Sequence, residues 1–432
     1  MSWTGVILAA GKGSRMNSKL SKVLHPVCGV PMVSYVAASI REAGVNRLVV
    51  IASPDIASAE TLRSAVGDDA LIVVQQEQLG TADALLQARE SCQDVDKILV
   101  ATGDAPLISG VTLEKLRSLH ENSTSTITLL TSVLDSPDGL GRVCRGDNGS
   151  PAKIVEDIHA DEPTLAIKEV NSGFYCFDAK WIWSSLTKIS PSPSGEIYLT
   201  EIVELAALAG RPVSALGADD PTEVIGVNDR VQLAVATGIK REQIRRRCML
   251  AGVTLEDPST TYIDACVTIG EDTLVRPGSH LLGHTTIGSG SEIGPDTVLT
   301  DATVGHRSKV ICSNAEFATI GDEVSIGPYS HLRRGTIVEN NAYIGNFAEI
   351  KNSRIGMGTR VGHFSYVGDT VIGSNANIGA GTVTCNFDGE SKHSTLIGDR
   401  AFVGSGSMLV APLEIGKDSS TGAGSVVTKD VL

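Results

Sequence analysis

Aliphatic residues recur every six positions along much of the C-terminal half of the chain. An α-helix repeats every 3.6 residues and an isolated strand every two, so neither produces this period. A parallel β-helix does, because each six-residue unit supplies a short strand with one inward aliphatic side chain and a turn. The pattern therefore predicts a parallel β-helix over residues 251–432, looser at first and regular from Ile320. The regular positions are Ile320, Ile326, Leu332, Val338, Ile344, Ile350, Ile355, Val361, Val367, Ile372, Ile378, Ile397, Val403, Leu409 and Ile415.

The N-terminal part of the chain alternates short β-rich runs with helical patterns. Over residues 1–228 this rhythm predicts an α/β fold, with a mostly parallel sheet and helices on both faces. Ligands of such sheets bind at the carboxyl ends of the strands. The predicted strands are Thr4–Ala10, Arg47–Ala52, Leu71–Gln75 and Lys97–Ala101, and the predicted helices are Pro31–Ala43, Ala57–Val66, Thr81–Glu90 and Val111–His120.

Residues 229–250 predict a linker helix, because apolar residues recur along one of its faces. The same stretch carries a cluster of basic side chains from Lys240 to Arg247. Such a cluster is typical either of an RNA-binding arm or of the solvated face of a connecting helix. The second interpretation is favoured.

The overall charge and the cysteines narrow the classes of partner. Across 432 residues the formal net charge is −14, which disfavours nucleic acids and anionic membranes. The eight cysteines are scattered without a C-x-x-C pair, as is typical of reduced thiols. The first ten residues lack the features of a signal peptide, and no apolar run approaches the ~20 residues of a membrane helix. We therefore expect a cytoplasmic protein without membrane insertion.

The first predicted strand leads into a glycine-rich turn, Leu8-Ala9-Ala10-Gly11-Lys12-Gly13-Ser14-Arg15-Met16. Glycines let backbone N–H groups approach a phosphate closely, and Lys12, Arg15 and the later Lys22 add positive charge. The string matches neither the G-x-G-x-x-G dinucleotide pattern nor a P-loop ending in G-K-[ST]. A short glycine turn alone is often only a tight turn, but the longer string with its cations predicts phosphate binding.

Asp104 follows the predicted strand Lys97–Ala101 and lies at the ligand-binding edge of the sheet. A carboxylate there is typical either of a magnesium ligand or of an ordinary loop or helix-capping residue. Mg²⁺ takes one or two protein oxygens and keeps several waters, so Asp104 and the amide oxygen of Asn228 suffice. The sequence thus predicts a magnesium site at this edge.

Further strings follow the glycine turn in a fixed order. They are Lys22–His25, Gln75–Ala82, Thr102–Leu107, Gly139–Arg142, Ile154–Glu156, Asn171–Gly173, Gly226–Asn228 and, in the coil, Asn377–Asn386. In this order they resemble the GlmU family of bacterial bifunctional enzymes, N-acetylglucosamine-1-phosphate uridylyltransferases and glucosamine-1-phosphate N-acetyltransferases. The resemblance covers nearly the whole chain. It implies a Rossmann-like nucleotidyltransferase domain followed by a left-handed parallel β-helix.

By this resemblance, the first domain transfers UMP from UTP to N-acetylglucosamine-1-phosphate, with Mg²⁺ held by Asp104 and Asn228. The sugar phosphate attacks the α-phosphorus directly, Lys22 contacts the phosphates and Arg15 neutralises the departing pyrophosphate. Asn228 also counts as a substrate-binding residue. The other residues expected to bind uridine, phosphates or N-acetylglucosamine are Leu8, Ala9, Ala10, Gly11, Gln75, Gly80, Thr81, Thr102, Gly103, Gly141, Glu156 and Asn171.

His363 follows the Val361-Gly362 step of the repeat, where a coil side chain should project outward. A lone histidine is more often structural than catalytic, but a neutral imidazole here can accept a proton from an amine that attacks a thioester. The repeat breaks soon afterwards, at Thr384–His393. Such an insertion in a solenoid usually forms a loop on a binding face.

The resemblance implies that the coil acetylates glucosamine-1-phosphate with acetyl-CoA, using His363 as general base. The residues expected to bind the sugar phosphate are Arg333, Lys351, Tyr366 and Asn377. Those expected to border acetyl-CoA are Ala380, Asn386, Phe387, Ser405 and Ala423. The resemblance also implies a homotrimer with acetyltransferase pockets between subunits.

The chain departs from the family's usual residues at several positions. Phe387 and Arg334 stand where the family usually has Tyr and Pro, and Ser21 and Asp83 where it has Pro and His. The sequence ends at Leu432, without the family's C-terminal tail and its cofactor-binding arginine, which would weaken acetyl-CoA binding. The alternatives to a bifunctional enzyme are a single-activity nucleotidyltransferase whose coil only oligomerises, and a non-catalytic trimeric scaffold.

Overall fold

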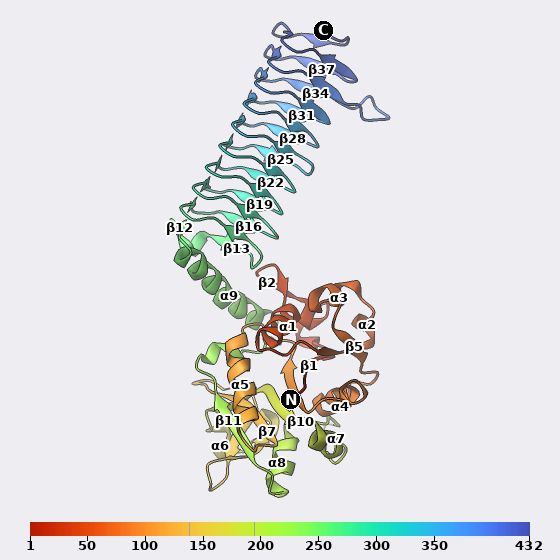
Figure 1. The fold of residues 1–432 in the computed structure, drawn as a ribbon, viewed down its shortest axis with the longest axis vertical. Coiled ribbons are helices and arrows are strands. Elements are labelled where there is room, and N and C mark those ends of the chain that lie inside the picture. Colours follow the sequence, from red (N-terminus) through yellow and green to blue (C-terminus); the bar gives the residue numbers. More distant parts are fainter. Residues whose placement is uncertain (138, 194) are drawn as a thin grey trace. The chain divides into compact units, whose positions relative to one another are not determined.

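The computed structural model describes residues 1–137, 139–193 and 195–432 (Figure 1). These residues form two compact units, Met1–Lys240 and Arg241–Leu432. The first is an α/β unit and the second a stack of short parallel strands, which confirms the predicted fold class. Within the described ranges, no helix combines the length and apolar character needed to cross a membrane.

A nine-stranded sheet forms the centre of the first unit. Its strands are β1 (Trp3–Ala9), β4 (Leu48–Ala52), β5 (Leu71–Val74), β6 (Lys97–Thr102), β7 (Ile127–Val133), β8 (Arg142–Arg145), β9 (Pro151–Val155), β10 (Glu169–Asp178) and β11 (Val213–Gly217). Strands β6, β1, β4 and β5 pair in parallel, as predicted, each within one residue of its predicted bounds. The antiparallel β10 lies between β6 and β7, and β11 pairs in parallel with β7. A small hairpin, β2 (Pro26–Val27) and β3 (Val30–Pro31), stands apart.

Helices cover both faces of this sheet. They are α1 (Met32–Glu42), α2 (Pro54–Ala57), α3 (Glu60–Val66), α4 (Thr81–Gln87), α5 (Gly110–Asn122), α6 (Glu162–Leu165), α7 (Ala179–Leu186) and α8 (Glu201–Leu208). The single helix predicted at Ala57–Val66 is wrong, because Ala59 has extended backbone (φ −72°, ψ 127°) that separates α2 from α3.

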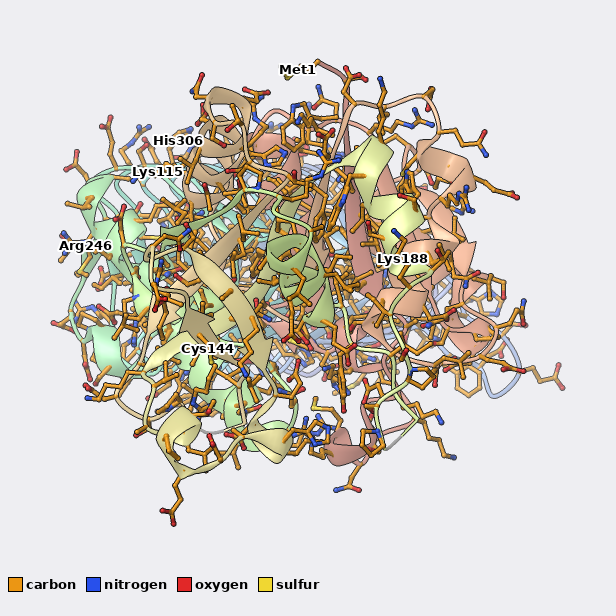
Figure 2. The ribbon with its side chains drawn as sticks, turned by 90° about the horizontal axis from the view of Figure 1, so that it is seen from below. Met1, Lys115, Cys144, Lys188, Arg246 and His306 are labelled. Atoms are coloured by element: carbon orange, nitrogen blue, oxygen red, sulfur yellow. The ribbon has the colours of Figure 1, made fainter. Side chains whose placement is uncertain are left out.

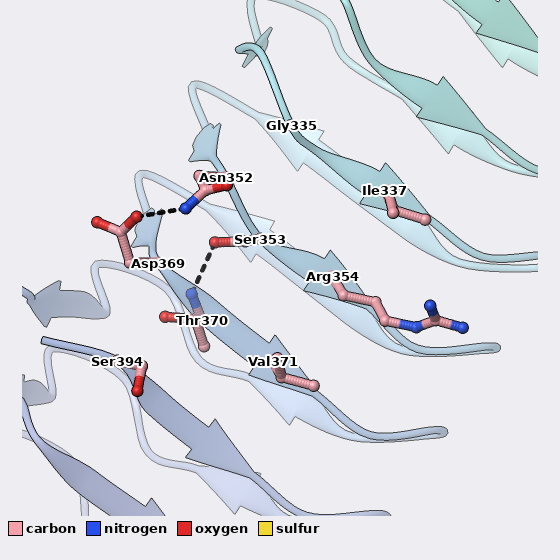
Figure 3. A pocket seen from close by; sticks show the side chains of 9 residues that line it. All are labelled: Gly335, Ile337, Asn352, Ser353, Arg354, Asp369, Thr370, Val371 and Ser394. Carbon is pink, nitrogen blue, oxygen red and sulfur yellow. Dashed lines mark hydrogen bonds between the residues drawn. The ribbon is translucent and has the colours of Figure 1, made fainter.

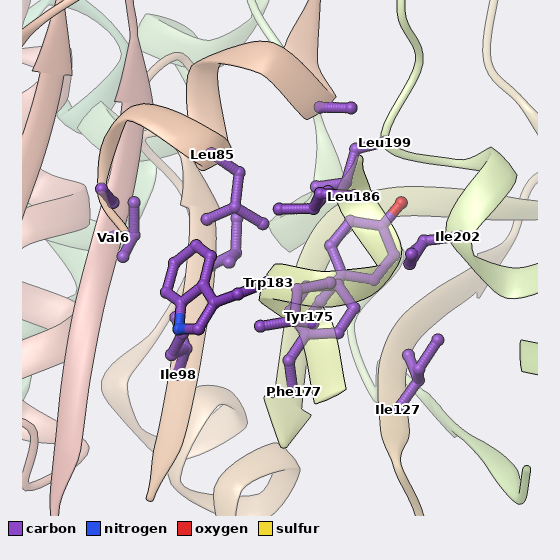
Figure 4. Packing of buried hydrophobic residues seen from close by; sticks show 14 of the residues in the cluster. Val6, Leu85, Ile98, Ile127, Tyr175, Phe177, Trp183, Leu186, Leu199 and Ile202 are labelled. Atoms are coloured by element: carbon purple, nitrogen blue, oxygen red, sulfur yellow. The ribbon is translucent and has the colours of Figure 1, made fainter. Parts of the chain in front are cut away.

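Successive residues of the central strands pack into two different hydrophobic clusters. Val6 contributes to the cluster that holds residues of α4, α7 and α8, whereas Ile7 contributes to the cluster that holds residues of α1, α3 and α5. Figure 4 shows the first of these, where Trp183 and Leu85 pack near Val6. Because side chains alternate along a strand, burial of both sets requires helices on both faces. The double-sided sheet is therefore confirmed.

Helix α9 (Arg230–Leu250) carries the basic cluster, and most of its cations have partners. Within the first unit, Lys240 Nζ lies 4.6 Å from the ring centroid of Tyr35. Within the second unit, Arg245 donates to Pro258 O and Arg247 donates to Ala265 O at 3.2 Å, whereas Arg246 is exposed (Figure 2). These contacts use some of the cations to anchor the helix, and Arg247 is exposed like Arg246, so the solvated face of a connecting helix stays the favoured interpretation.

The second unit contains three parallel sheets to which successive strands contribute in turn. The first sheet holds β12 (Thr254–Leu255), β15 (Leu274–Val275), β18 (Glu292–Ile293), β21 (Lys309–Val310), β24 (Ser325–Ile326), β27 (Tyr343–Asn346), β30 (Arg360–His363), β33 (Asn377–Ile378) and β36 (Phe402–Val403). The second holds β13 (Tyr262–Ile263), β16 (His280–Leu282), β19 (Val298–Thr300), β22 (Asn314–Glu316), β25 (His331–Leu332), β28 (Glu349–Lys351), β31 (Tyr366–Gly368), β34 (Val383–Cys385), β37 (Met408–Val410) and β39 (Val426–Val427). The third holds β14 (Thr268–Ile269), β17 (Thr286–Ile287), β20 (Thr303–Val304), β23 (Thr319–Ile320), β26 (Ile337–Val338), β29 (Arg354–Ile355), β32 (Thr370–Ile372), β35 (Thr395–Ile397) and β38 (Leu413–Ile415).

The six-residue repeat forms the interior of this coil. Its fifteen aliphatic side chains from Ile320 to Ile415 are all at most 3% exposed, and like positions pair across turns, as Ile344 does with Val361. The predicted start of the insertion at Thr384 is wrong. Thr384 occupies the inward position of β34, where its hydroxyl accepts from Gly368 N–H at 2.8 Å. The insertion therefore begins at Asn386, after the strand.

A shallow groove on the coil shows how its corners are held (Figure 3). Asn352 Nδ2 donates to Asp369 Oδ1 at 2.7 Å, and Thr370 N–H donates to Ser353 Oγ at 3.0 Å, each bond joining neighbouring turns. Asn352 has φ 45°, in the left-handed region that Asn tolerates better than most residues. It lies within the five-residue step from Ile350 to Ile355, but six-residue steps also have left-handed corners, as at Asn341 and Phe364, so this conformation is general to the coil.

Replacing Ile344 with Ala should lower the local stability of the coil by about 2–5 kcal/mol, because it leaves a cavity in the inward column. The measurement is the opening free energy from amide hydrogen exchange in strands β27 and β30. Tyr343→Ala is the matched control, since the neighbouring Tyr343 side chain points outward and is 39% exposed. It should cost about 1 kcal/mol or less. Equal effects of the two substitutions would contradict the inward packing of Ile344.

Candidate active sites

A cavity of about 550 Å³ opens where β1, β5 and β6 end. Ten of the residues predicted for nucleotide, phosphate or metal binding line it: Leu8, Ala9, Ala10, Gly11, Lys22, Gln75, Gly80, Thr81, Thr102 and Asp104. Glu196 also lines it and was not predicted, because it lies on a later loop without any recognisable motif. The carboxyl ends of the parallel strands thus gather the polar groups in one place, as such sheets do.

Glycines make close approaches around this cavity. Gly13 has φ 58°, and a Cβ there would lie 2.7 Å from Lys22 Cβ. Gly80 has φ 131°, and a Cβ there would lie 2.4 Å from Ile197 O. Gly103 N–H donates to Leu8 O at 2.9 Å, which joins the ends of β6 and β1 although Gly103 itself is not among the lining residues. Side chains at Gly13 and Gly80 would therefore displace the walls of the cavity.

Lys22, Asp104 and Asn228 meet at one side of the cavity. The ammonium of Lys22 contacts Asp104 Oδ2 and lies 3.1 Å from Asn228 Oδ1. The backbone supports this arrangement, because Val227 N–H donates to Asp104 O at 2.9 Å. One cationic group thus touches both oxygens that the sequence predicts as metal ligands.

The same two oxygens suit a hard divalent cation. Among the described residues, no group of three or more His, Cys, Asp or Glu side chains is placed to hold a metal ion. Mg²⁺ needs no such cluster, since it usually binds through one or two protein oxygens and keeps its waters. The carboxylate of Asp104 and the amide oxygen of Asn228 fit that requirement, because a single cation reaches both.

Arg15, which was predicted to contact pyrophosphate, has no contact with the cavity. It is exposed on the 3₁₀ turn Ser14–Met16 and does not line the cavity. The turn itself is fixed, because Arg230 Nε donates to Met16 O at 3.2 Å. Arg15 therefore projects from an anchored part of the glycine-rich turn.

Gly141, Glu156 and Asn171 form a second cluster, and none of the three lines the cavity. Asn171 N–H donates to Gly141 O at 2.9 Å, and a Cβ on Gly141 would lie 3.6 Å from Glu156 Oε2. Burial raises the pKa of the Glu156 carboxyl, while the Thr200 hydroxyl, which donates to Glu156 Oε1 at 2.7 Å, opposes that shift. The absent side chain of Gly141 thus leaves space in front of a partly buried acceptor.

On the coil, His363 lies at a corner between the first and second sheets, at the end of β30. It pairs in register with Asn346, and its Nδ1 contacts Asn346 Oδ1. His363 O accepts from Gly381 N–H at 2.9 Å, Ala380 O from Gly406 N–H at 2.7 Å, and Ser405 O from Gly424 N–H at 2.7 Å. The same corner on successive turns therefore carries His363, Ala380, Ser405 and Ala423 in one column, bringing the predicted base and three predicted cofactor residues together. The contact of Asn346 was not predicted.

A polar cluster lies at the opposite edge of the second sheet. A Cβ on Gly368 would lie 2.5 Å from the Tyr366 hydroxyl and 2.8 Å from Asn386 Nδ2, so these two predicted residues converge. Asn386 Nδ2 also donates to Asp369 Oδ2 at 2.5 Å. Two further predicted residues are not shown to join this cluster. Arg333 forms an ion pair with Glu349 at 2.9 Å, and Phe387 lies on the insertion with 58% of its surface exposed.

Lys392 joins this cluster, although it belongs to no motif recognised in the sequence. The nearby Lys351 ammonium lowers the pKa of Lys392 through hydrogen bonding and charge repulsion. An anion beside the two amino groups would offset their repulsion and favour the protonated form of both. Asn377 does not join them, because it lies on β33 in the first sheet whereas Lys351 and Tyr366 belong to the second.

Known proteins match both units. The MobA-like NTP transferase domain matches residues 5–138, the bacterial transferase hexapeptide (six repeats) matches 266–310 and 317–352, and the hexapeptide repeat of succinyl-transferase matches 395–429. The chain is similar to the bifunctional protein GlmU of Geobacillus sp. (strain WCH70), with 44% identity over 99% of this chain and 93% of the relative. The corresponding proteins of Heliobacterium modesticaldum and Syntrophomonas wolfei are 43% and 41% identical, over 99% and 100% of this chain and 93% and 96% of the relatives.

The chain belongs to the GlmU family. The resemblance stated from the sequence is thereby confirmed. Membership, together with an NTP transferase domain and transferase hexapeptide repeats, makes the chain an enzyme and favours the bifunctional interpretation over a single activity or a scaffold. Its substrates accordingly belong to the nucleotides and sugar phosphates.

Gly80→Ala should destabilise the first unit more than Gly210→Ala. Both glycines have positive φ, but the Cβ would meet Ile197 O at 2.4 Å at Gly80 and nothing within 4 Å at Gly210. Strain alone should cost about 1 kcal/mol at Gly210, and strain with the clash about 3 kcal/mol or more at Gly80. Thermal unfolding of the two variants measures the difference. Equal melting temperatures would contradict the close approach at Gly80.

Proposed function

We propose that this chain acetylates glucosamine-1-phosphate with acetyl-CoA and then transfers UMP from UTP to the N-acetylglucosamine-1-phosphate formed. The products are UDP-N-acetylglucosamine and pyrophosphate. GlmU-family membership over 99% of the chain is the observation that carries the proposal. We assign uridylyl transfer to residues 1–228, a linker to 229–250 and acetyl transfer to 251–432.

In the first reaction site, the chain's own groups position and neutralise phosphates. A sugar-phosphate oxygen attacks the α-phosphorus of UTP, and the bond to the β-phosphate oxygen breaks to release pyrophosphate. Backbone N–H groups of the glycine turn and Lys22 hold the phosphates, Arg15 meets the leaving pyrophosphate, and Gly141, Glu156 and Asn171 hold the acetylated sugar. Such transfer needs positioning and charge neutralisation rather than a covalent intermediate. Mg²⁺, bound by Asp104 and Asn228, would add positive charge beside the phosphates.

In the second site, His363 acts as general base. Its Nε2 takes a proton as the sugar amine nitrogen attacks the thioester carbonyl, and the CoA thiolate then leaves as the C–S bond breaks. With Nδ1 donating to Asn346 Oδ1, Nε2 carries the lone pair that this step requires. The polar cluster supplies Lys351, Lys392 and Tyr366 to the sugar phosphate and Asn386 to the cofactor.

We propose that the active form is a homotrimer with acetyl-transfer pockets between subunits. Asn377 lies on a different sheet from Lys351 and Tyr366, so one chain does not gather all the proposed sugar-phosphate residues. A second copy that presents its first sheet beside this second sheet would complete the set. The cytoplasmic location stays a prediction.

The decisive experiment supplies glucosamine-1-phosphate, acetyl-CoA, UTP and Mg²⁺ to the full chain and follows free CoA and pyrophosphate separately. Both products are expected. Pyrophosphate released only when preformed N-acetylglucosamine-1-phosphate is added, without any CoA, would instead establish a single-activity uridylyltransferase. Release of neither product would refute the proposal.

His363→Ala should lower CoA release by about 10²–10⁴-fold, because the amine loses its general base. Pyrophosphate release from preformed N-acetylglucosamine-1-phosphate should stay unchanged, since that site lies in the other unit. His284→Ala, which alters an exposed histidine elsewhere on the coil, is the matched control and should affect neither product. Retention of CoA release by His363→Ala would exclude its role as base.

Lys392→Met should raise the KM for glucosamine-1-phosphate by about tenfold, because a phosphate would lose one of two neighbouring ammonium groups. The kcat for acetyl transfer should change much less, since Lys392 does not act on the amine. Lys417→Met removes an exposed lysine elsewhere on the coil and should leave KM unaltered. A fall in kcat at constant KM would argue against phosphate binding by Lys392.

A further inference from the structure

The side-chain amide of Gln75 forms part of the cavity wall in the first unit. Gln75 follows β5, its backbone N–H donates to Ala52 O at 2.9 Å, and only 3% of the residue is exposed. Its position is therefore fixed by the sheet. The amide can face the cavity with either its oxygen or its nitrogen.

Asp83 decides this orientation. Gln75 Nε2 donates to Asp83 Oδ2 at 2.7 Å and to Gly80 O at 3.2 Å. An ionised carboxylate and a backbone carbonyl can only accept hydrogen bonds, so the nitrogen of the amide must face them. In the described part of the chain, no recorded hydrogen bond uses Gln75 Oε1, and this oxygen is not among the buried atoms without a partner. Gln75 thus presents an acceptor.

The carboxylate of Asp83 is itself held. Gln87, one turn further along α4, donates from Nε2 to Asp83 Oδ1 at 3.2 Å. Asp83 therefore lies between two amide nitrogens, with one oxygen for each. A side chain fixed in this way can set the orientation of its neighbour instead of following it.

We propose that Asp83 determines nucleobase specificity by locking the Gln75 amide with its oxygen toward the base, so that the site selects uracil over cytosine. Uracil carries a ring N–H on its pairing edge, which an amide oxygen accepts, whereas cytosine carries a lone pair at that ring nitrogen. Two acceptors facing each other leave both unpaired, and sites built on hydrogen bonding discriminate strongly against such analogues. This inference rests on the proposed uridylyl transfer, with the base beside Gln75. Asp83 is a positioning residue, since it acts through Gln75.

Removing the carboxylate should allow the amide to turn over. In Asp83→Ala, Gln75 Nε2 keeps only the longer bond to Gly80 O, and the opposite orientation can present an N–H to the lone pair of cytosine. The ratio of kcat/KM for UTP to that for CTP should then fall by about tenfold or more, through a gain with CTP as well as a loss with UTP.

The experiment measures pyrophosphate release by the full chain with N-acetylglucosamine-1-phosphate and either UTP or CTP. Asp83→Asn is the conservative variant: its amide oxygen still accepts from Gln75, so the ratio should stay within about threefold of the original. Gln87→Met is the matched control, since it removes the other bond to Asp83 and leaves the Gln75 contact intact. It should lower the ratio far less than Asp83→Ala does, because the bond between Asp83 and Gln75 remains.

An unchanged ratio in Asp83→Ala, or an equal loss with both nucleotides, would overturn the inference and leave only a structural role for Asp83. If Asp83→Ala fails to fold, Asp83→Leu, which keeps the branched shape of the side chain at Cγ but cannot accept a hydrogen bond, serves as the second variant. A wild-type chain that uses CTP as well as UTP would overturn the inference while leaving nucleotidyl transfer intact. If the wild type releases no pyrophosphate at all, the proposed function fails, and calorimetric binding of UTP and CTP tests the inference by the same ratio.

Discussion

Parallel pairing of neighbouring strands is the constraint on which both candidate sites depend. In the first unit it brings the carboxyl ends of β1 and β6 to one edge, which places Leu8 beside Thr102 and leads directly to Asp104. In the second unit it stacks like positions on successive turns, about 4.8 Å apart, so that Asn346 lies opposite His363. In both units, strand pairing alone brings the polar residues together. The same rule that buries the aliphatic columns also lines up the polar corners outside them.

Charge works locally in this protein. The chain carries a net charge of −14, yet its candidate sites for anionic substrates hold cations. Lys22 is partly buried against Asp104 and Asn228, where interactions between charges are less weakened by water than at the surface. Lys351 and Lys392 repel each other enough to lower the pKa of Lys392. The phosphate that we propose to bind there would relieve this repulsion.

The sequence predicted those features that a local pattern encodes, and missed those that arise between distant segments. The period of six predicted the inward column because each turn must bury one side chain. The period did not identify Thr384 as an inward residue because Thr384 is not aliphatic. Its hydroxyl is tolerated there because it accepts a hydrogen bond from the backbone of the neighbouring turn. Lys392 and Glu196 lie on loops whose residues carry no periodicity, so only the folded chain reveals their neighbours. The same holds for Asn346, seventeen residues before the histidine that it contacts.

The direction of a hydrogen bond, meaning which group donates, cannot be read from the sequence. The chemistry of the partners determines this direction at Gln75 but leaves it open at His363. The imidazole of His363 can donate or accept through Nδ1, so the contact with Asn346 has two consistent polarities, and only the proposed role of general base selects one. Gln75 has no such freedom, because both partners of its nitrogen accept and neither donates. From the sequence Asp83 was only a departure from the family's usual His. In the folded chain its carboxylate fixes the orientation of the Gln75 amide, so that the amide oxygen is the atom left for a substrate to contact.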